Sequence, residues 1–126
     1  MAQSFKDLVV WQKAMDLSVV IYQMTKTFPK DEMFGLTSQM RRAAVSIASN
    51  IAEGEGRKSK KEFAHFLGIA LGSKAELETQ MLLCEKIGLV TKDDSVNALS
   101  LLDEVGKMLA SLKQKQDGCV RRSLKS

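Results

Sequence analysis

The chain has 126 residues and a formal net charge of +4, and hydrophobic residues make up 44% of it. This length supports one core and hence one domain, and the single proline and few aromatic residues favour a helical protein. No apolar run approaches the roughly 20 residues of a membrane span, and the start of the chain lacks the pattern of a signal peptide. We therefore expect a cytoplasmic protein whose mild positive charge permits an anionic partner.

Hydrophobic periodicity predicts four helices. They cover about residues 7–27, 33–55, 59–88 and 91–114. Pro29 follows the first helix, and Gly54 and Gly56 are expected to end the second helix in a left-handed cap. Ser59 and Glu62 have the spacing of a capping box, which marks the start of the third helix.

The fourth helix begins at a second capping box, formed by Thr91 and Asp94, and its apolar stripe fades near Gln114. Short connections between long helices favour neighbours that run in opposite directions. The sequence therefore predicts an all-α fold, an antiparallel up-down-up-down four-helix bundle. We expect residues 1–116 to form this domain and residues 117–126 to form a basic, disordered C-terminal tail.

The first two helices each carry apolar residues on two faces. In the first helix, the stripe expected to face the core consists of Leu8, Trp11, Met15, Val19 and Tyr22. The stripe on its far side consists of Val10, Leu17, Val20, Ile21 and Met24, and the outer face of the second helix includes Val45, Ala48 and Ala52. Exposed stripes of this size exceed the apolar patches of ordinary monomers, so we interpret them as a homo-oligomer interface. The alternative, a small alanine-rich surface, explains the second helix but not the first.

Two arginines, Arg41 and Arg42, lie in the middle of the second helix. In an antiparallel bundle the middle of the third helix lies opposite, where Glu76 and Glu78 supply carboxylates. The centre of a packed helix is a poor place for an exposed anion site, so we expect structural ion pairs between these arginines and glutamates.

Patterns for catalysis and metal binding are weak. Glu62 and His65 have the E-x-x-H spacing of carboxylate-bridged metal bundles, but such sites need the motif on two helices and this chain has one histidine. Cys84 and Cys119 fit neither a metal spacing nor a disulfide framework, and Cys84 is expected to be a buried hydrophobic residue. We therefore expect no enzymatic activity, no metal and no cofactor.

The densest basic cluster follows the second helix and consists of Arg57, Lys58, Lys60 and Lys61. Such runs are commonly solvated surface. In a ring of subunits, however, the cluster would recur once per subunit, and a long polyanion could bridge several copies. No aromatic residues interleave with these cations, which favours phosphate contacts over base stacking. The cluster predicts binding of structured RNA or another nucleic acid.

Three ordered blocks of sequence resemble the four-helix bundle proteins of the 23S rRNA intervening-sequence family, which are related to the accessory variability determinants of diversity-generating retroelements. The blocks are FKDLVVWQKAMDL, FPKDEMFGLTSQMRRAAVSIASNIAEGEGR and FLGIALGSKAELETQ, and the resemblance covers about residues 5–112. It implies an antiparallel bundle that assembles as a homopentameric ring. The accessory determinants bind a reverse transcriptase and nucleic acid through basic surface, although those residues do not transfer position by position.

Two hypotheses about function follow. In the first, the protein is a non-enzymatic homo-oligomer that binds structured RNA through repeated basic turns. In the second, it is a protein-interaction scaffold for a polypeptide such as a reverse transcriptase, and its charge has no direct role in nucleic-acid binding.

Overall fold

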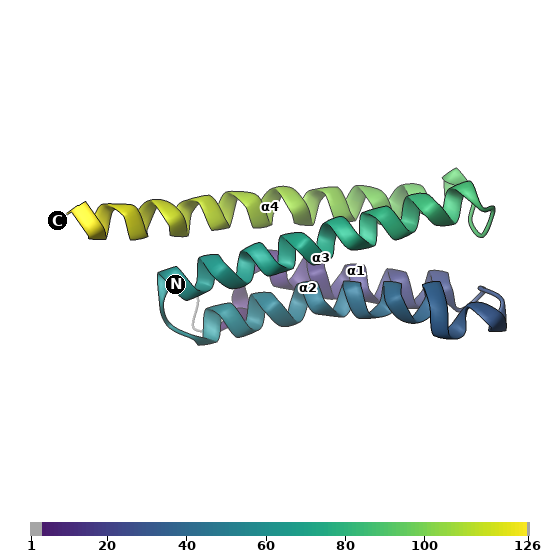
Figure 1. Cartoon of the computed structure of the whole chain (residues 1–126), viewed down its shortest axis with the longest axis horizontal. Helices are drawn as coiled ribbons and strands as arrows, with labels where there is room; N and C mark the ends of the chain where they lie inside the picture. Colours follow the sequence, from purple (N-terminus) through teal and green to yellow (C-terminus); the bar gives the residue numbers. More distant parts are fainter. Residues whose placement is uncertain (1–3, 126) are drawn as a thin grey trace.

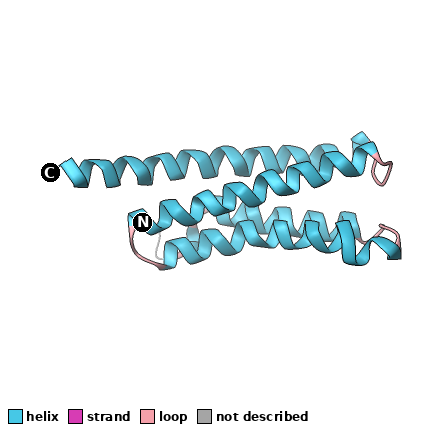
Figure 2. Ribbon diagram, in the orientation of Figure 1, coloured by secondary structure: helices cyan, strands magenta, loops and turns pink. Residues whose placement is uncertain are grey.

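The computed structural model describes residues 4–125, and all regular structure in that range is helical (Figures 1 and 2). The four long helices are α1 (Val9–Thr25), α2 (Ser38–Gly56), α3 (Lys60–Lys86) and α4 (Lys92–Lys125). Shorter segments are the 3-10 helices η1 (Phe5–Asp7) and η2 (Lys30–Glu32) and the π-helical segment η3 (Met33–Thr37). The predicted all-α class and the four long helices are confirmed.

The predicted capping box at the start of α4 has both of its hydrogen bonds, and at the start of α3 the predicted N-cap bond of Ser59 is present. The Ser59 hydroxyl accepts a hydrogen bond from the Glu62 backbone N–H at 3.3 Å. The Thr91 hydroxyl accepts one from the Asp94 N–H at 3.1 Å, and the Thr91 N–H reaches the Asp94 carboxylate at 3.5 Å. These side chains satisfy N–H groups that have no partner within the first helical turn.

The four helices enclose one core. Helix α1 packs against α2 and α4, and α3 packs against the same two helices. The largest fully buried side chains come from all four, and they are Leu17, Ile21, Met40, Ile47, Ile51, Leu67, Leu77, Met81, Cys84, Leu102, Val105 and Leu109. Burial of each such aliphatic side chain contributes roughly 1.5–3 kcal/mol, so this core provides most of the driving force for folding.

The orientation predicted for α1 is largely wrong, although Leu8 and Trp11, assigned to the core, do pack against it. Leu17, Ile21 and Val10, assigned to an oligomer interface, lie in the core, and they are at most 4% exposed. Met15 and Val19, assigned to the core, are 43% and 54% exposed. Both stripes are apolar, so periodicity determines the helix but not which stripe the neighbouring helices cover.

The other predicted interface residues divide between core and surface. Ala48 is buried in the core, which corrects its assignment to the outer face of α2. Val20 and Met24 are partly buried against the core. Val45 is 42% exposed and Ala52 is half-buried, so these two remain available to a neighbouring molecule.

The ion pairs predicted for the middle of the bundle are not formed. The Arg41 guanidinium instead donates to the Thr25 hydroxyl at 2.9 Å and lies over the Tyr22 ring, 4.5 Å from its centroid. The Glu78 carboxylate pairs with the Lys74 ammonium, at 2.7 Å, and not with an arginine. The nearest helical neighbour, one turn away on α3, therefore satisfies Glu78.

The contacts of Arg42 and Glu76 also differ from those predicted. They line one open hollow between α2 and α3, but no ion pair joins them within the described residues. The Glu76 carboxylate accepts a hydrogen bond from the Gln80 side chain at 3.2 Å. The centre of the α2–α3 contact is instead marked by a hydrogen bond between the Ser46 and Ser73 hydroxyls, at 2.8 Å.

The C-terminal segment expected to be a disordered tail continues α4 as helix as far as Lys125. Figure 1 shows α4 projecting beyond the ends of the other three helices at its C-terminal end. Within the described range 4–125, no helix has the length and apolar character needed to cross a bilayer.

Leu17→Ala should lower the free energy of unfolding by about 2–5 kcal/mol, because it leaves a cavity among fully buried side chains. The neighbouring exposed substitution Asp16→Ala should change that free energy by less than about 0.5 kcal/mol. Urea denaturation followed by circular dichroism measures both. Equal effects of the two substitutions would contradict the observed orientation of α1.

Candidate nucleic-acid interface

The basic turn between α2 and α3 depends on a close helix contact at Gly54. This glycine is buried in the last turn of α2, where a Cβ atom would lie 2.7 Å from the Cβ of Phe66. The predicted left-handed cap at Gly54 and Gly56 is therefore wrong. Lys58 instead adopts the left-handed conformation, with φ of 58°, and reverses the chain. Gly54 is required for packing, and Lys58 makes the turn.

Carboxylates of the same segment hold two of the four predicted cations. Arg57 lies 3.6 Å from Glu53 and 3.6 Å from Glu62, and its guanidinium lies over the Phe66 ring at 5.1 Å. The Lys58 ammonium pairs with Glu55 at 2.9 Å. These contacts reduce the positive field of Arg57 and Lys58 and tie both side chains to the bundle.

Lys60 and Lys61 are exposed, and no ion pair involves either of them within the described residues. They lie in the first turn of α3 and line one side of a hollow of about 360 Å³. The other side of the hollow belongs to the last turns of α4, and its lining residues are Cys119, Val120, Ser123 and Leu124. The structure thus brings the basic turn against a segment that lies about 60 residues later in the sequence.

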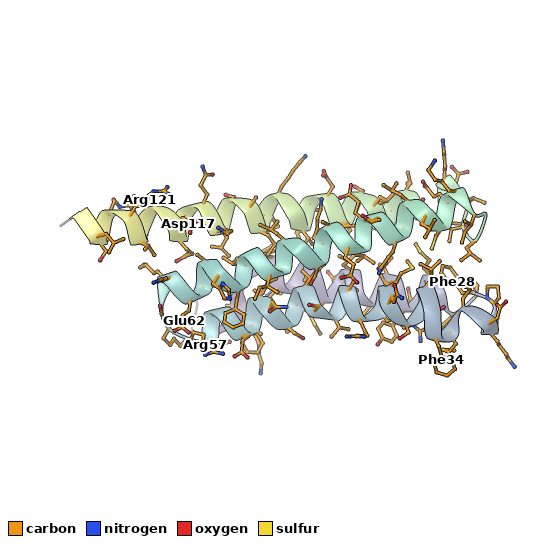
Figure 3. All side chains as sticks on the ribbon, in the orientation of Figure 1. Phe28, Phe34, Arg57, Glu62, Asp117 and Arg121 are labelled. Carbon is orange, nitrogen blue, oxygen red and sulfur yellow. The ribbon has the colours of Figure 1, made fainter. Side chains whose placement is uncertain are left out.

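This part of α4 carries further cations. Arg121 and Arg122 are exposed, and the Arg122 guanidinium donates to the Cys119 sulfur at 3.2 Å. Asp117, the nearby carboxylate, pairs with Lys113 at 2.8 Å. Figure 3 shows Arg57, Glu62, Asp117 and Arg121 at the same end of the molecule, whereas Phe28 and Phe34 lie at the other end.

Sequence reasoning did not include Arg121 and Arg122 in the site because it assigned them to a disordered tail. The helical spacing of Leu112, Val120 and Leu124 could have indicated that α4 continues. Its apolar positions are sparse there, which made the helix difficult to recognise beyond Gln114.

The remaining reactive side chains do not form a second site. His65 is exposed, and the described residues contain no group of three or more metal-ligating side chains. Cys84 is fully buried, and its thiol donates to the Met40 sulfur at 3.6 Å. Burial, and secondarily the negative charge of Glu32, raises the pKa of the Cys84 thiol, so the thiolate is disfavoured at neutral pH.

At the other end of the molecule, an open hollow of about 510 Å³ lies between α1, η3 and α2. Its apolar walls include Tyr22, Met33, Phe34 and Val45, all of which are exposed. Phe34 is 95% exposed, which is unusual for a phenylalanine. Arg41 and Arg42 line the same hollow, so this surface combines exposed apolar side chains with two cations.

Comparison with known proteins identifies the family. The model of the 23S rRNA-intervening sequence protein family matches residues 6–111. The chain belongs to this family. The family expected from the sequence is therefore confirmed, whereas residues 112–126, which include Arg121 and Arg122, lie outside the match.

A solved structure is similar over nearly its whole length. It is a protein of unknown function from the S23 ribosomal protein family of Bacteroides thetaiotaomicron, with 27% sequence identity and a TM-score of 0.75. The similarity covers 83% of this chain and 98% of that one. None of the curated proteins compared with the chain matches it.

Gly54→Ala should lower the free energy of unfolding by about 1–3 kcal/mol, because the added methyl group collides with Phe66 and Phe63. Gly72→Ala, in the middle of α3, meets no atom within 4 Å and should raise that free energy by about 0.5–1 kcal/mol. Thermal and urea denaturation measure both. A Gly54→Ala protein as stable as the Gly72→Ala protein would show that α2 and α3 do not approach closely at the turn.

Proposed function

We propose that this family member is a non-enzymatic, cytoplasmic protein that binds structured RNA through its basic turns. The cluster of exposed cations around the α2–α3 turn carries this proposal. Lys60 and Lys61 have no carboxylate partner within the described residues, so their charge is available to phosphate groups. Arg57 and Lys58 complete the turn, although their carboxylate partners weaken their contribution.

The proposal includes assembly as a homopentameric ring of antiparallel bundles. Exposed apolar side chains on α1, namely Met15, Val19 and Tyr22, support an interface between subunits. Val45 on α2 and Phe34 in η3 continue this apolar surface. Repetition of the basic turn around a ring would let a long RNA contact several turns at once, which raises the overall affinity without new contacts.

The alternative function is that of a protein-interaction scaffold, for example for a reverse transcriptase. The exposed hollow beside Phe34 favours this reading, because apolar pockets with an aromatic rim suit polypeptide partners. The two functions predict different responses to salt. Phosphate contacts release counterions and weaken steeply as salt rises, whereas a packed apolar interface responds much less.

The first functional prediction concerns Lys60 and Lys61. Binding of a labelled RNA hairpin, measured by anisotropy, should weaken as salt rises, with a logarithmic slope of roughly 0.9 for each phosphate contacted. K60E/K61E should weaken binding and reduce this slope by about 2, because it removes two phosphate contacts.

K86E/K92E is the matched control, because Lys86 and Lys92 are exposed and lie at the α3–α4 connection. Each double substitution takes the formal net charge from +4 to 0. The control should retain the wild-type slope. Absence of wild-type binding at low salt would refute the RNA-binding function and leave the scaffold.

The second functional prediction concerns assembly. Val19→Lys should reduce the mass measured by light scattering while leaving the helical content unchanged, because it places a charge in the exposed stripe of α1. Val96→Lys makes the same substitution at a comparably exposed position on α4 and should keep the wild-type mass. If both variants keep that mass, α1 does not form the interface.

A further inference from the structure

The cations at the basic end of the molecule differ in how strongly they are already engaged. Carboxylates pair with Arg57 and Lys58 within the turn, and Lys113 is paired with Asp117 on α4. Lys60 and Lys61 are two exposed cations at this end without an ion pair among the described residues. Two lysines on one helical turn provide a small contact for a polyanion.

The last turns of α4 supply the missing charge. Arg121 and Arg122 are exposed and form no ion pair within residues 4–125. The hydrogen bond from Arg122 to Cys119 places its guanidinium beside a residue that lines the hollow shared with Lys60 and Lys61. Arg121 lies at the same end of the molecule (Figure 3). This end of the molecule therefore carries cations from two segments that lie far apart in the sequence, with the hollow between the two helices.

We infer that the first turn of α3 and the last turns of α4 form one phosphate-binding surface for double-helical RNA. This inference rests on the proposed function and deepens it, because it assigns the surface to Lys60, Lys61, Arg121 and Arg122. These arginines lie beyond residue 111, where the family match ends, so the surface is a property of this chain and not of the matched region alone.

Two features favour the duplex over single strands. The described side chains that line the hollow include no aromatic residue, and Phe66 lies beneath the Arg57 guanidinium. Unpaired bases therefore find no ring to stack on in the hollow. Arginine and lysine side chains suit phosphate oxygens, which a rigid duplex presents at regular spacing without regard to base sequence.

The test uses the full chain and two labelled 20-base-pair RNA duplexes of unrelated sequence, with one of the single strands as comparison. R121E/R122E should weaken duplex binding at least tenfold at low salt and reduce the logarithmic salt slope by about 2. R121K/R122K keeps the charge and should retain most of the wild-type slope. K86E/K92E, which changes the net charge as much as R121E/R122E does, should leave the slope unchanged.

Three other outcomes would each contradict a different claim. If R121E/R122E binds like K86E/K92E while K60E/K61E loses binding, α4 does not contribute, and the proposed function stands without this inference. Tighter binding of the single strand than of either duplex would refute the duplex as ligand. If the wild-type chain binds no RNA at low salt, the proposed function fails, and this inference fails with it.

Discussion

The close approach of α2 and α3 at Gly54 is the constraint on which the basic end of the molecule depends. Only a residue without a side chain allows the Phe66 Cβ to lie so near the α2 backbone. This contact sets how closely α3 approaches α2, and Lys58 reverses the chain between them in a left-handed conformation. The first turn of α3, with Lys60 and Lys61, also faces the last turns of α4, because α4 packs along α3. Helix packing therefore positions charges that have no direct role in the core.

The electrostatics of this end depend on which cations already have partners. Carboxylates hold Arg57 and Lys58, because the end of α2 and the start of α3 both carry glutamates. The exposed lysines of α3 and the arginines of α4 keep their charge available to solvent and to anions. A count of basic residues in the sequence treats all of these cations alike, whereas a polyanion would encounter mainly those without carboxylate partners.

The two ends of the molecule have different surface chemistry. One end carries Lys60, Lys61 and the arginines of α4, and the other carries exposed Phe34, Met33 and Tyr22 around an open hollow that Arg41 and Arg42 also line. Arg41 belongs to this second end, where it stacks on Tyr22 instead of joining a buried ion pair. The family match covers residues 6–111 and leaves the charged end of α4 outside the matched residues.

The sequence by itself determined the helices and the starts of two of them, because periodicity and capping are local: Ser59 and Thr91 make the hydrogen bonds that their spacing predicts. It also determined the family. Only the tertiary structure decided which stripe of α1 enters the core, since Leu17 and Met15 are both apolar and the neighbouring helices select between them. The composition of the basic end was likewise decided only by the tertiary structure. Its cations come from segments far apart in the chain, and packing of α4 along α3, a long-range interaction that no local pattern encodes, brings them together.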